Sequence, residues 1–307
     1  MVDGMDVFDR RLVRLRRERA AADWAAHDFL FREVAERLAE RLDDMRRRFP
    51  VALELGRRGG ALTAAIATRA GIETLFHMGL SESAVHSAGA LTVVADEETL
   101  PFRDGAFDLI ASSLALHWVN DLPGALAQAQ RALKPDGLFL AALFGGGTLA
   151  ELREALMDAE MEEEGGVSPR VSPFADVRDI GALLQRAGFA LPVVDVDTIT
   201  VTFPDALALM KDLRGMGETN AVKARRSGFL RRATLGRAAQ IYRDRHGGAD
   251  GRIPATFRVL FVTAWAPASS QPKALRPGSA TARLADALDA REVGTGVGTT
   301  PTRRKGE

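Results

Sequence analysis

The stretch from Val93 to Leu149 constrains the fold of this 307-residue chain most. It begins with a short apolar strand and an acidic loop, and continues with a second strand over 107–112 and a helix over 121–133. A turn at 134–137 and a fully apolar strand over 138–144 complete it, and such a strand is typical of a sheet covered on both faces. Strands that alternate with helices of this length predict a parallel sheet. We therefore expect this stretch to form the second half of a doubly wound α/β sheet.

The same alternation extends to both sides of this stretch. The further predicted elements are a helix over 29–48 ended by Pro50, a strand over 51–55, a helix over 60–70, strands over 73–78 and 91–95, helices over 148–163 and 176–187, a strand over 191–203, and a last strand over 255–266. Together they predict one seven-stranded, mostly parallel α/β sheet, with Leu53, Leu109 and Leu140 buried in it.

We expect five regions along the chain. They are a solvated helical lead-in over 1–28, a main core over 29–203, a helical insert over 204–254, the last core strand over 255–266, and a tail over 267–307. The tail is rich in Pro, Gly, Ala, Thr and Arg and has no sustained apolar period, so we expect most of it to be disordered.

Composition excludes several classes of function. The 41 Lys and Arg residues balance 41 Asp and Glu residues, so no net charge favours a nucleic-acid partner. The absence of Cys excludes disulfides, thiol nucleophiles and Cys-based zinc sites, and the five His residues show no metal-ligand spacing. No apolar run approaches the roughly 18 residues of a membrane-spanning helix. These features predict a cytoplasmic protein that binds no metal.

The first strand-to-helix turn, from Glu54 to Gly60, is a candidate ligand site. Gly56 and Gly60 allow a close approach of the backbone, and the N-terminus of the following helix offers N–H groups to a bound group. Arg58 stands where a glycine-rich binding turn would have its middle glycine. The alternative is a turn with a purely structural role.

An acidic loop follows the third strand. Asp96 and Glu97 come directly after that strand, where a carboxylate at the edge of the sheet can accept a hydrogen bond from an adenine amine. The second strand, by contrast, ends in Gly79 where a ribose-binding acid is expected. The alternative interpretation is that the acidic loop is only solvated.

Three polar residues follow the fourth strand and are candidates for catalysis or binding. Ser112, Ser113 and His117 should lie at the carboxyl edge of the sheet, where ligands bind in such folds. His117 could act as a general base near neutral pH. Its alternative role is that of a packed, hydrogen-bonded core residue beside Trp118.

Several of these segments together carry a resemblance that covers nearly the whole chain. The segments are Val94–Glu98, Leu100-Pro101-Phe102, SSLALHWVNDLP at 112–123, LKPDG at 133–137, LFGGGTLAELR at 143–153, SPRVSPFADVRDIGALLQRAGF at 168–189, LRGMGETNA at 213–221 and RIPATF at 252–257. The chain resembles the class I S-adenosylmethionine-dependent methyltransferases. Within them it is most similar to the branch of the mitochondrial complex I assembly factor and its bacterial relatives.

The resemblance implies a fold, a cofactor and a reaction. The core over 29–203 would be a methyltransferase-like cofactor-binding domain, and the cofactor would be S-adenosylmethionine. The reaction would be methyl transfer, or hydroxylation of an arginine on a complex I core subunit. Carried over by position, the cofactor contacts would be Glu54, Gly56, Arg58, Gly60, Asp96, Glu97 and Ser112, and the catalytic residues Ser113 and His117.

Three functions remain open at the level of the sequence. The first is an enzyme that acts on a protein side chain during complex I assembly. The second is a non-catalytic assembly chaperone, which Arg57, Arg58 and Gly79 favour because they depart from the cofactor pattern. The third is a carrier-protein or small-molecule methyltransferase, against which the branch-specific segments after Gly165 count.

Overall fold

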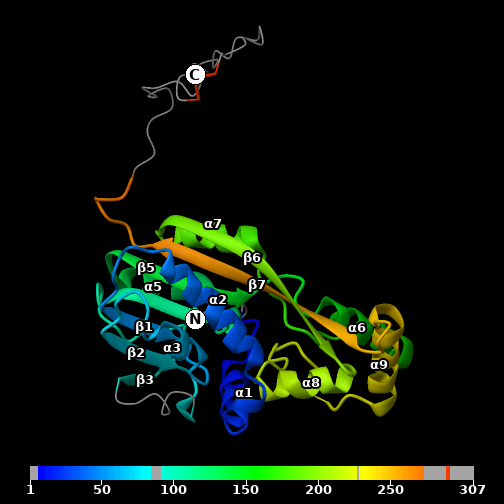
Figure 1. Cartoon of the computed structure of the whole chain (residues 1–307). Coiled ribbons are helices and arrows are strands. Elements are labelled where there is room, and N and C mark those ends of the chain that lie inside the picture. The colour runs from blue at the N-terminus through cyan, green and yellow to red at the C-terminus, as the bar shows by residue number, and fades with distance from the viewer. Residues whose placement is uncertain (1–5, 84–90, 227, 273–287, 291–307) are drawn as a thin grey trace, which may run out of the picture. The chain divides into compact units, whose positions relative to one another are not determined.

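The computed structural model describes residues 6–83, 91–226, 228–272 and 288–290 (Figure 1). The chain divides into two compact units, Met1–Ser269 and Ser270–Glu307, and the description below concerns the first. Most of the tail predicted to be disordered, 267–307, lies outside the described residues, at 273–287 and 291–307.

The first unit contains a seven-stranded sheet. Its strands are β1 (Val51–Leu55), β2 (Thr74–Gly79), β3 (Thr92–Val94), β4 (Phe107–Ser113), β5 (Leu133–Phe144), β6 (Ala190–Phe203) and β7 (Ile253–Trp265). The order across the sheet is β3-β2-β1-β4-β5-β7-β6. Strands β1 to β5 pair in parallel, and β7 pairs antiparallel with both β5 and β6. The predicted doubly wound, mostly parallel sheet is thus confirmed.

Helices cover both faces of this sheet. They are α1 (Arg10–Ala21), α2 (Phe29–Asp43), α3 (Ala61–Ile66), α5 (Leu122–Ala132), α6 (Ala150–Glu164), α7 (Val177–Arg186), α8 (Ala206–Gly215) and α9 (Arg232–His246). One core cluster joins α2 and α3 to one face, and another joins α5 and α7 to the opposite face. As predicted, Leu53, Leu109 and Leu140 are fully buried.

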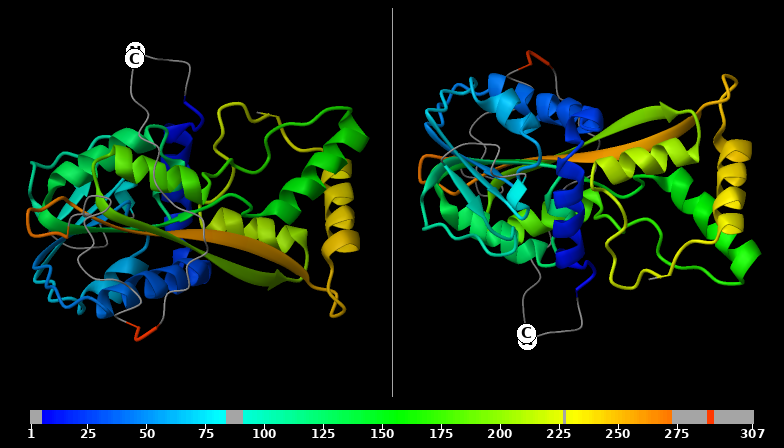
Figure 2. Two further views of the ribbon diagram at one scale, coloured as in Figure 1. Left: turned by 90° about the horizontal axis from the view of Figure 1, so that it is seen from above. Right: turned by 90° about the horizontal axis from the view of Figure 1, so that it is seen from below.

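Strands β6 and β7 are longer than the strands they flank and run past the rest of the sheet (Figure 2). Helices α6, α8 and α9 pack around their far ends and share the core cluster of α2 and α3. Tyr242 on α9 is fully buried, and its hydroxyl donates to the Pro254 carbonyl at 2.7 Å. The predicted insert thus contains the helices α8 and α9, and the described residues between them form no further helix.

The main correction to the sequence prediction concerns the N-terminal lead-in, which is not a solvated helix. Helix α1 buries Val13, Arg17 and Ala20, and Phe8 before it pairs with Val222 in an isolated bridge. The reason is that one face of α1 carries both apolar and charged side chains, and both kinds contact the rest of the protein. The apolar ones join a small cluster with Trp118.

Two predicted boundaries also change. The helix predicted over 29–48 ends at Asp43. Strand β5 begins at Leu133 and not at residue 138, because Leu133 already pairs with Phe107 of β4. The predicted turn at 134–137 is an irregularity inside the strand, in which Asp136 takes a φ of 63°.

Candidate functional site

The candidate site lies at the carboxyl ends of β1 and β4, where the strand order reverses. Doubly wound sheets bind their ligands at this position because the loops of neighbouring strands diverge there. The turn after β1, the acidic loop after β3 and the segment after β4 all meet at this edge. Helix α1 lies against the same edge, as its contacts with the acidic loop show.

The glycine turn after β1 is packed tightly against the protein itself. Gly56 and Gly60 take φ values of 77° and 92°, which favour glycine. A Cβ on Gly56 would lie 2.3 Å from the Ala115 Cβ, and one on Gly59 would lie 1.8 Å from the Trp24 Nε1. Side chains of the protein itself thus stand directly against the turn at Gly56 and Gly59.

Glu54, at the end of β1, belongs to a buried ion-pair cluster. Its carboxylate accepts a hydrogen bond from Arg57 at 2.9 Å and lies 2.9 Å from the His77 Nδ1. Burial alone raises the pKa of Glu54, but the hydrogen bond from His77 and the charge of Arg57 outweigh burial and hold the pKa below its usual value. Glu54 is thus a carboxylate that already has its cationic partner.

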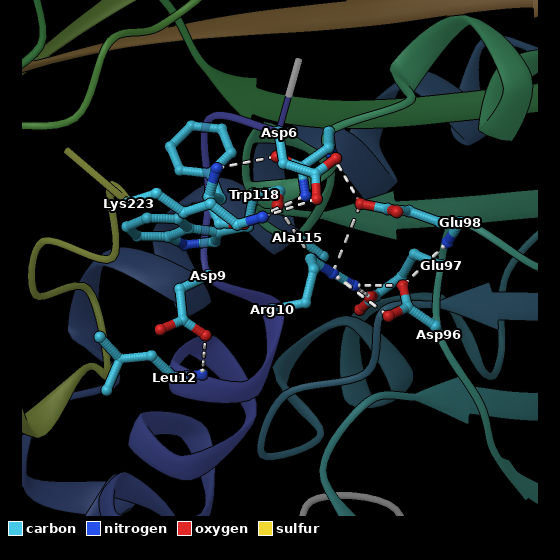
Figure 3. A network of polar contacts seen from close by, with 12 residues as sticks. Asp6, Asp9, Arg10, Leu12, Asp96, Glu97, Glu98, Ala115, Trp118 and Lys223 are labelled. Carbon is cyan, nitrogen blue, oxygen red and sulfur yellow. Dashed lines mark hydrogen bonds and ion pairs between the residues drawn. The ribbon is translucent and has the colours of Figure 1, made fainter. Parts of the chain in front are cut away.

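Arg10 of α1 binds the acidic loop, as Figure 3 shows. Its Nη2 and Nε donate to the two oxygens of Asp96 at 2.5 Å and 3.3 Å, in the fork geometry that arginine makes with a carboxylate. Nη2 also donates to Glu97, Nη1 donates to the Trp118 carbonyl, and Glu98 lies 3.6 Å from Nε. One guanidinium group therefore forms ion pairs with three consecutive acids.

Arg17, two turns further along α1, completes this cluster. Its Nη1 donates to the fully buried carboxylate of Glu97 at 2.6 Å. Burial raises the pKa of Glu97, but the charges of Arg17 and Arg10 outweigh burial and hold the pKa below its usual value. Asp96 and Glu97, which the sequence assigns to ligand binding, are thus neutralised by arginines of the protein itself.

Arg58 belongs to a second cluster of buried polar contacts, which centres on Glu218. Its guanidinium contacts the Glu218 carboxylate and the Met216 carbonyl. It lies over the Phe31 ring at 4.6 Å from the centroid and 5.3 Å from the Trp24 ring. Arg58 also donates to the Leu114 carbonyl at 3.3 Å, so it is surrounded by one carboxylate, two carbonyls and two aromatic rings.

His117 shares the same carboxylate. Its Nε2 lies 3.1 Å from the Glu218 Oε2, which also accepts from the Trp118 Nε1 at 2.9 Å. Burial raises the pKa of Glu218, but the charge of Arg58, together with His117, outweighs burial and brings the pKa to about 2, so this carboxylate only accepts hydrogen bonds. Burial lowers the pKa of His117 against the opposing charge of Glu218.

The lowered pKa favours the neutral form of the His117 ring at neutral pH. A neutral imidazole beside an ionised carboxylate must carry its proton on Nε2, which leaves the lone pair on Nδ1. Within the described part of the chain, Nδ1 has no hydrogen-bond partner, and neither do the buried hydroxyls of Ser112 and Ser113. His117 therefore has the protonation of a general base at neutral pH, and its role as one stays a prediction.

The structure brings the predicted site residues together in three groups. Asp96 and Glu97 lie on Arg10 and Arg17, Arg58 and His117 lie on Glu218, and Glu54 lies on Arg57 beside the glycine turn. Within the described residues, no group of three His, Asp or Glu side chains is arranged to hold a metal ion. No helix of the described part is long and apolar enough to cross a membrane.

The sheet order and the glycine turn define a protein of the class I methyltransferase fold, and comparison with known proteins agrees. A methyltransferase domain model matches residues 53–141. A structure from Bacillus halodurans classed with the methyltransferases has a TM-score of 0.53 at 15% identity, and covers 77% of this chain and 100% of its own. The YcgJ protein of Bacillus subtilis has a TM-score of 0.51 at 16% identity, with 75% and 98% covered. At such identities these structures show the fold alone.

Sequence relatives identify the family. The arginine-hydroxylase NDUFAF5 of Danio rerio is 44% identical over 92% of this chain and 90% of its own length, and that of Homo sapiens is 43% identical over 90% and 82%. A malonyl-[acyl-carrier protein] O-methyltransferase of Xylella fastidiosa is 35% identical over 86% and 90%. The chain belongs to the family of the arginine-hydroxylase NDUFAF5, within the methyltransferases.

S-adenosylmethionine is the general expectation for this family, and its fit can be tested against the site. The carboxylates of Glu54, Asp96 and Glu97 are all bound by arginines of the chain, and Trp24 and Ala115 stand against the glycine turn. In this arrangement the residues present do not fit the cofactor. Its binding at the acidic loop would require Arg10 and Arg17 to release Asp96 and Glu97.

Sequence reasoning missed three residues of this site. Glu218 lies in the segment 213–221, which carried the resemblance but gave no sign of a role at the sheet edge. Arg10 and Arg17 lie in a region predicted to be solvated. The one available signal was their spacing of seven residues, which places both on one face of a helix.

Proposed function

We propose that this protein hydroxylates an arginine side chain of another protein, and that the modified protein is a core subunit of respiratory complex I. The name of the relatives at 42–44% identity supports the reaction, and the resemblance to the complex I assembly branch supports the partner. The proposal includes a cytoplasmic setting in a bacterium, which the bacterial relatives support.

The observation that carries the proposal is the fork between Arg10 and Asp96. The edge of the sheet binds guanidinium groups, and this one is the most accessible of them: the side chains of Arg10, Glu98 and Asp96 are 13%, 25% and 33% exposed. A substrate arginine that displaces Arg10 would meet the same carboxylates in the same geometry. It would also keep the buried charge of Glu97 compensated.

Hydroxylation and methylation differ in what they consume. Hydroxylation takes one oxygen atom from dioxygen and needs two electrons from a reductant, whereas methylation takes a methyl group from a donor. The side chains that fill the cofactor site count against methylation. The mass of the product distinguishes the two reactions, since it is heavier by one oxygen atom or by one CH2 group.

The test uses a complex I-bearing bacterium in which the gene is deleted and then restored on a plasmid. Mass spectrometry of arginine-containing peptides from purified complex I should find one arginine that gains an oxygen atom only when the protein is present. Identical peptide masses in both strains would overturn the proposal, and a gain of one CH2 group would replace hydroxylation by methylation.

Two variants test the place of the substrate arginine. With purified protein and subunit, Asp96→Asn should raise KM because it removes half of the fork, and Arg10→Gln should lower KM because it removes the competitor. The exposed neighbour Arg11 supplies the matched control, Arg11→Gln. If Arg10→Gln raises KM as Asp96→Asn does, the substrate arginine does not bind at Asp96 by displacing Arg10.

A non-catalytic assembly chaperone is the second candidate, and the filled cofactor site favours it. The same deletion strain separates the two functions. A chaperone would restore complex I assembly without any arginine changing in mass, and would still do so as the His117→Ala variant. An enzyme would restore the modification, and the variant would lose it.

A further inference from the structure

A cavity of about 360 Å³ lies beside this site, between the sheet edge and the helical insert. Its apolar wall comes from α6, the end of β5 and β7, through residues such as Leu152, Leu156, Phe144 and Phe257. The one acid in its lining, Glu218, already contacts Arg58 and His117. The cavity therefore offers a ligand an apolar interior in which this acid is already neutralised.

Four of the described arginines line the same cavity, and two of them form close ion pairs with acids. Arg170 contacts Glu160, and Arg226 contacts Glu164; both of these acids are nearly buried. Acids of the protein thus balance the charges of these two arginines. Their side chains line the cavity but carry no free charge for a ligand.

The other two arginines are not balanced in this way. The Arg16 Nη1 donates to the Thr219 carbonyl at 2.6 Å, and within the described residues Arg16 makes no ion pair. Arg225 reaches one acid, Asp9, at 3.8 Å. Burial lowers the pKa of Arg16 to about 10, and the positive charge of Arg225 acts in the same direction, against the opposing charge of Asp9. Two guanidinium groups therefore line one cavity, and among the described residues a single acid, Asp9, offsets their charge.

We propose that this cavity binds a small amphipathic anion, with its apolar chain or ring against Leu152 and Leu156 and its carboxylate or phosphate group between Arg16 and Arg225. An anion there would relieve the repulsion between the two guanidinium groups and accept hydrogen bonds from both. A cationic ligand would add to the repulsion, so this is a different site from that of the substrate arginine at Asp96. The inference does not depend on the modification of arginine.

The charge preference can be measured on the wild-type protein. Decanoate, decyl phosphate, decanol and decyltrimethylammonium have the same apolar chain and differ in their head groups. In calorimetric titration below their micellar concentrations, one or both anions should bind at least about tenfold more tightly than the alcohol, and the cation should bind weakest. Added salt should weaken the anions and leave the alcohol unchanged. Equal binding of anion and alcohol would overturn the proposal, because it would show unspecific apolar uptake.

Variants locate the site. The double change Arg16→Gln and Arg225→Gln should remove the preference for the anion, while Arg14→Gln, an exposed position on the same helix, should keep it. Leu156→Trp fills the cavity from its apolar wall and should abolish binding of the chain with any head group. Melting curves show whether each variant is folded. Unchanged anion affinity in the folded double variant would place the bound anion elsewhere and refute the inference.

Discussion

Loss of the Glu218 carboxylate should strongly destabilise the protein at neutral pH. It is buried and serves Arg58, His117 and Trp118 at once. The change Glu218→Gln keeps the size of the side chain and removes its charge, so Arg58 would be left as a buried cation without its counter-charge. Removing one partner of a buried ion pair typically costs about 3–5 kcal/mol.

The pKa gives a second value for the same quantity. The pKa of Glu218 lies at about 2 in the folded protein and at 4.5 in an unperturbed chain. The difference of about 2.5 pH units, at about 1.4 kcal/mol for each unit, gives about 3.5 kcal/mol. Because the folded pKa is the lower one, this stabilisation is fully present above pH 4.5 and is lost as the pH falls toward about 2.

Urea unfolding of wild type and Glu218→Gln between pH 7 and pH 2.5 measures this directly. The free energy of unfolding should differ by about 3.5 kcal/mol at pH 7, and the difference should shrink below pH 4.5. Glu163→Gln, an exposed acid on α6, is the control and should change stability by less than about 0.5 kcal/mol. A Glu218 effect below about 1 kcal/mol at pH 7, or one that does not change with pH, would refute the reasoning.

Three further outcomes follow from single contacts. Arg17→Met should cost about 3 kcal/mol or more in urea unfolding because Glu97 loses a buried partner, and an exposed-site change such as Arg14→Met should cost little; equal effects would contradict this. The same Arg17→Met variant should bind S-adenosylhomocysteine at least about tenfold more tightly than wild type, or 1.4 kcal/mol in titration, and unchanged affinity would show that Arg17 does not close the site. Tyr242→Phe should cost about 1 kcal/mol in thermal unfolding, since it leaves the Pro254 carbonyl without its donor, and an unchanged melting temperature would speak against that hydrogen bond.

The sheet could be predicted from the sequence because each strand carries its own signal. The apolar run over 138–144 requires cover on both faces, and Pro50 and Gly188 mark the ends of neighbouring elements. Such signals lie within a few residues of one another, so they survive without knowledge of the fold. Their errors are correspondingly local, as at Leu133, where pairing with Phe107 extends a strand into a predicted turn.

The contacts of the site could not be predicted in this way. Arg10 lies 86 residues from Asp96 in the chain, and His117 lies 101 residues from Glu218. An ion pair between distant residues leaves no periodicity, and any of the 41 acidic residues would have been an equally good partner on sequence grounds. Only the fold selects among them, because it brings α1 and the segment at 213–221 to one edge.

This difference changes the meaning of the two residues that depart from the glycine pattern. From the sequence, Arg58 and Gly79 indicate a cofactor site that has lost binding residues. The double change Arg58→Gly and Gly79→Asp would then be the repair that restores them. In the structure, Arg58 neutralises Glu218, so the repair would leave a buried acid without its cation. The double variant should therefore lose stability whether or not it gains affinity for S-adenosylmethionine.

The balance of charge at the sheet edge explains why an arginine is the better candidate for entry than the cofactor. Five carboxylates gather there, Glu54, Asp96, Glu97, Glu98 and Glu218, and four guanidinium groups of the chain compensate them. The adenine and ribose of the cofactor carry no positive charge, and its sulfonium and ammonium groups lie in the methionine part, so entry of the adenine at Asp96 would displace Arg10 and leave partly buried acids without a counter-charge, at a cost of several kcal/mol. An arginine side chain of another protein would bring the same charge and the same fork as Arg10, so the exchange would keep every acid paired. The electrostatics of the edge thus favour a guanidinium group as the incoming partner.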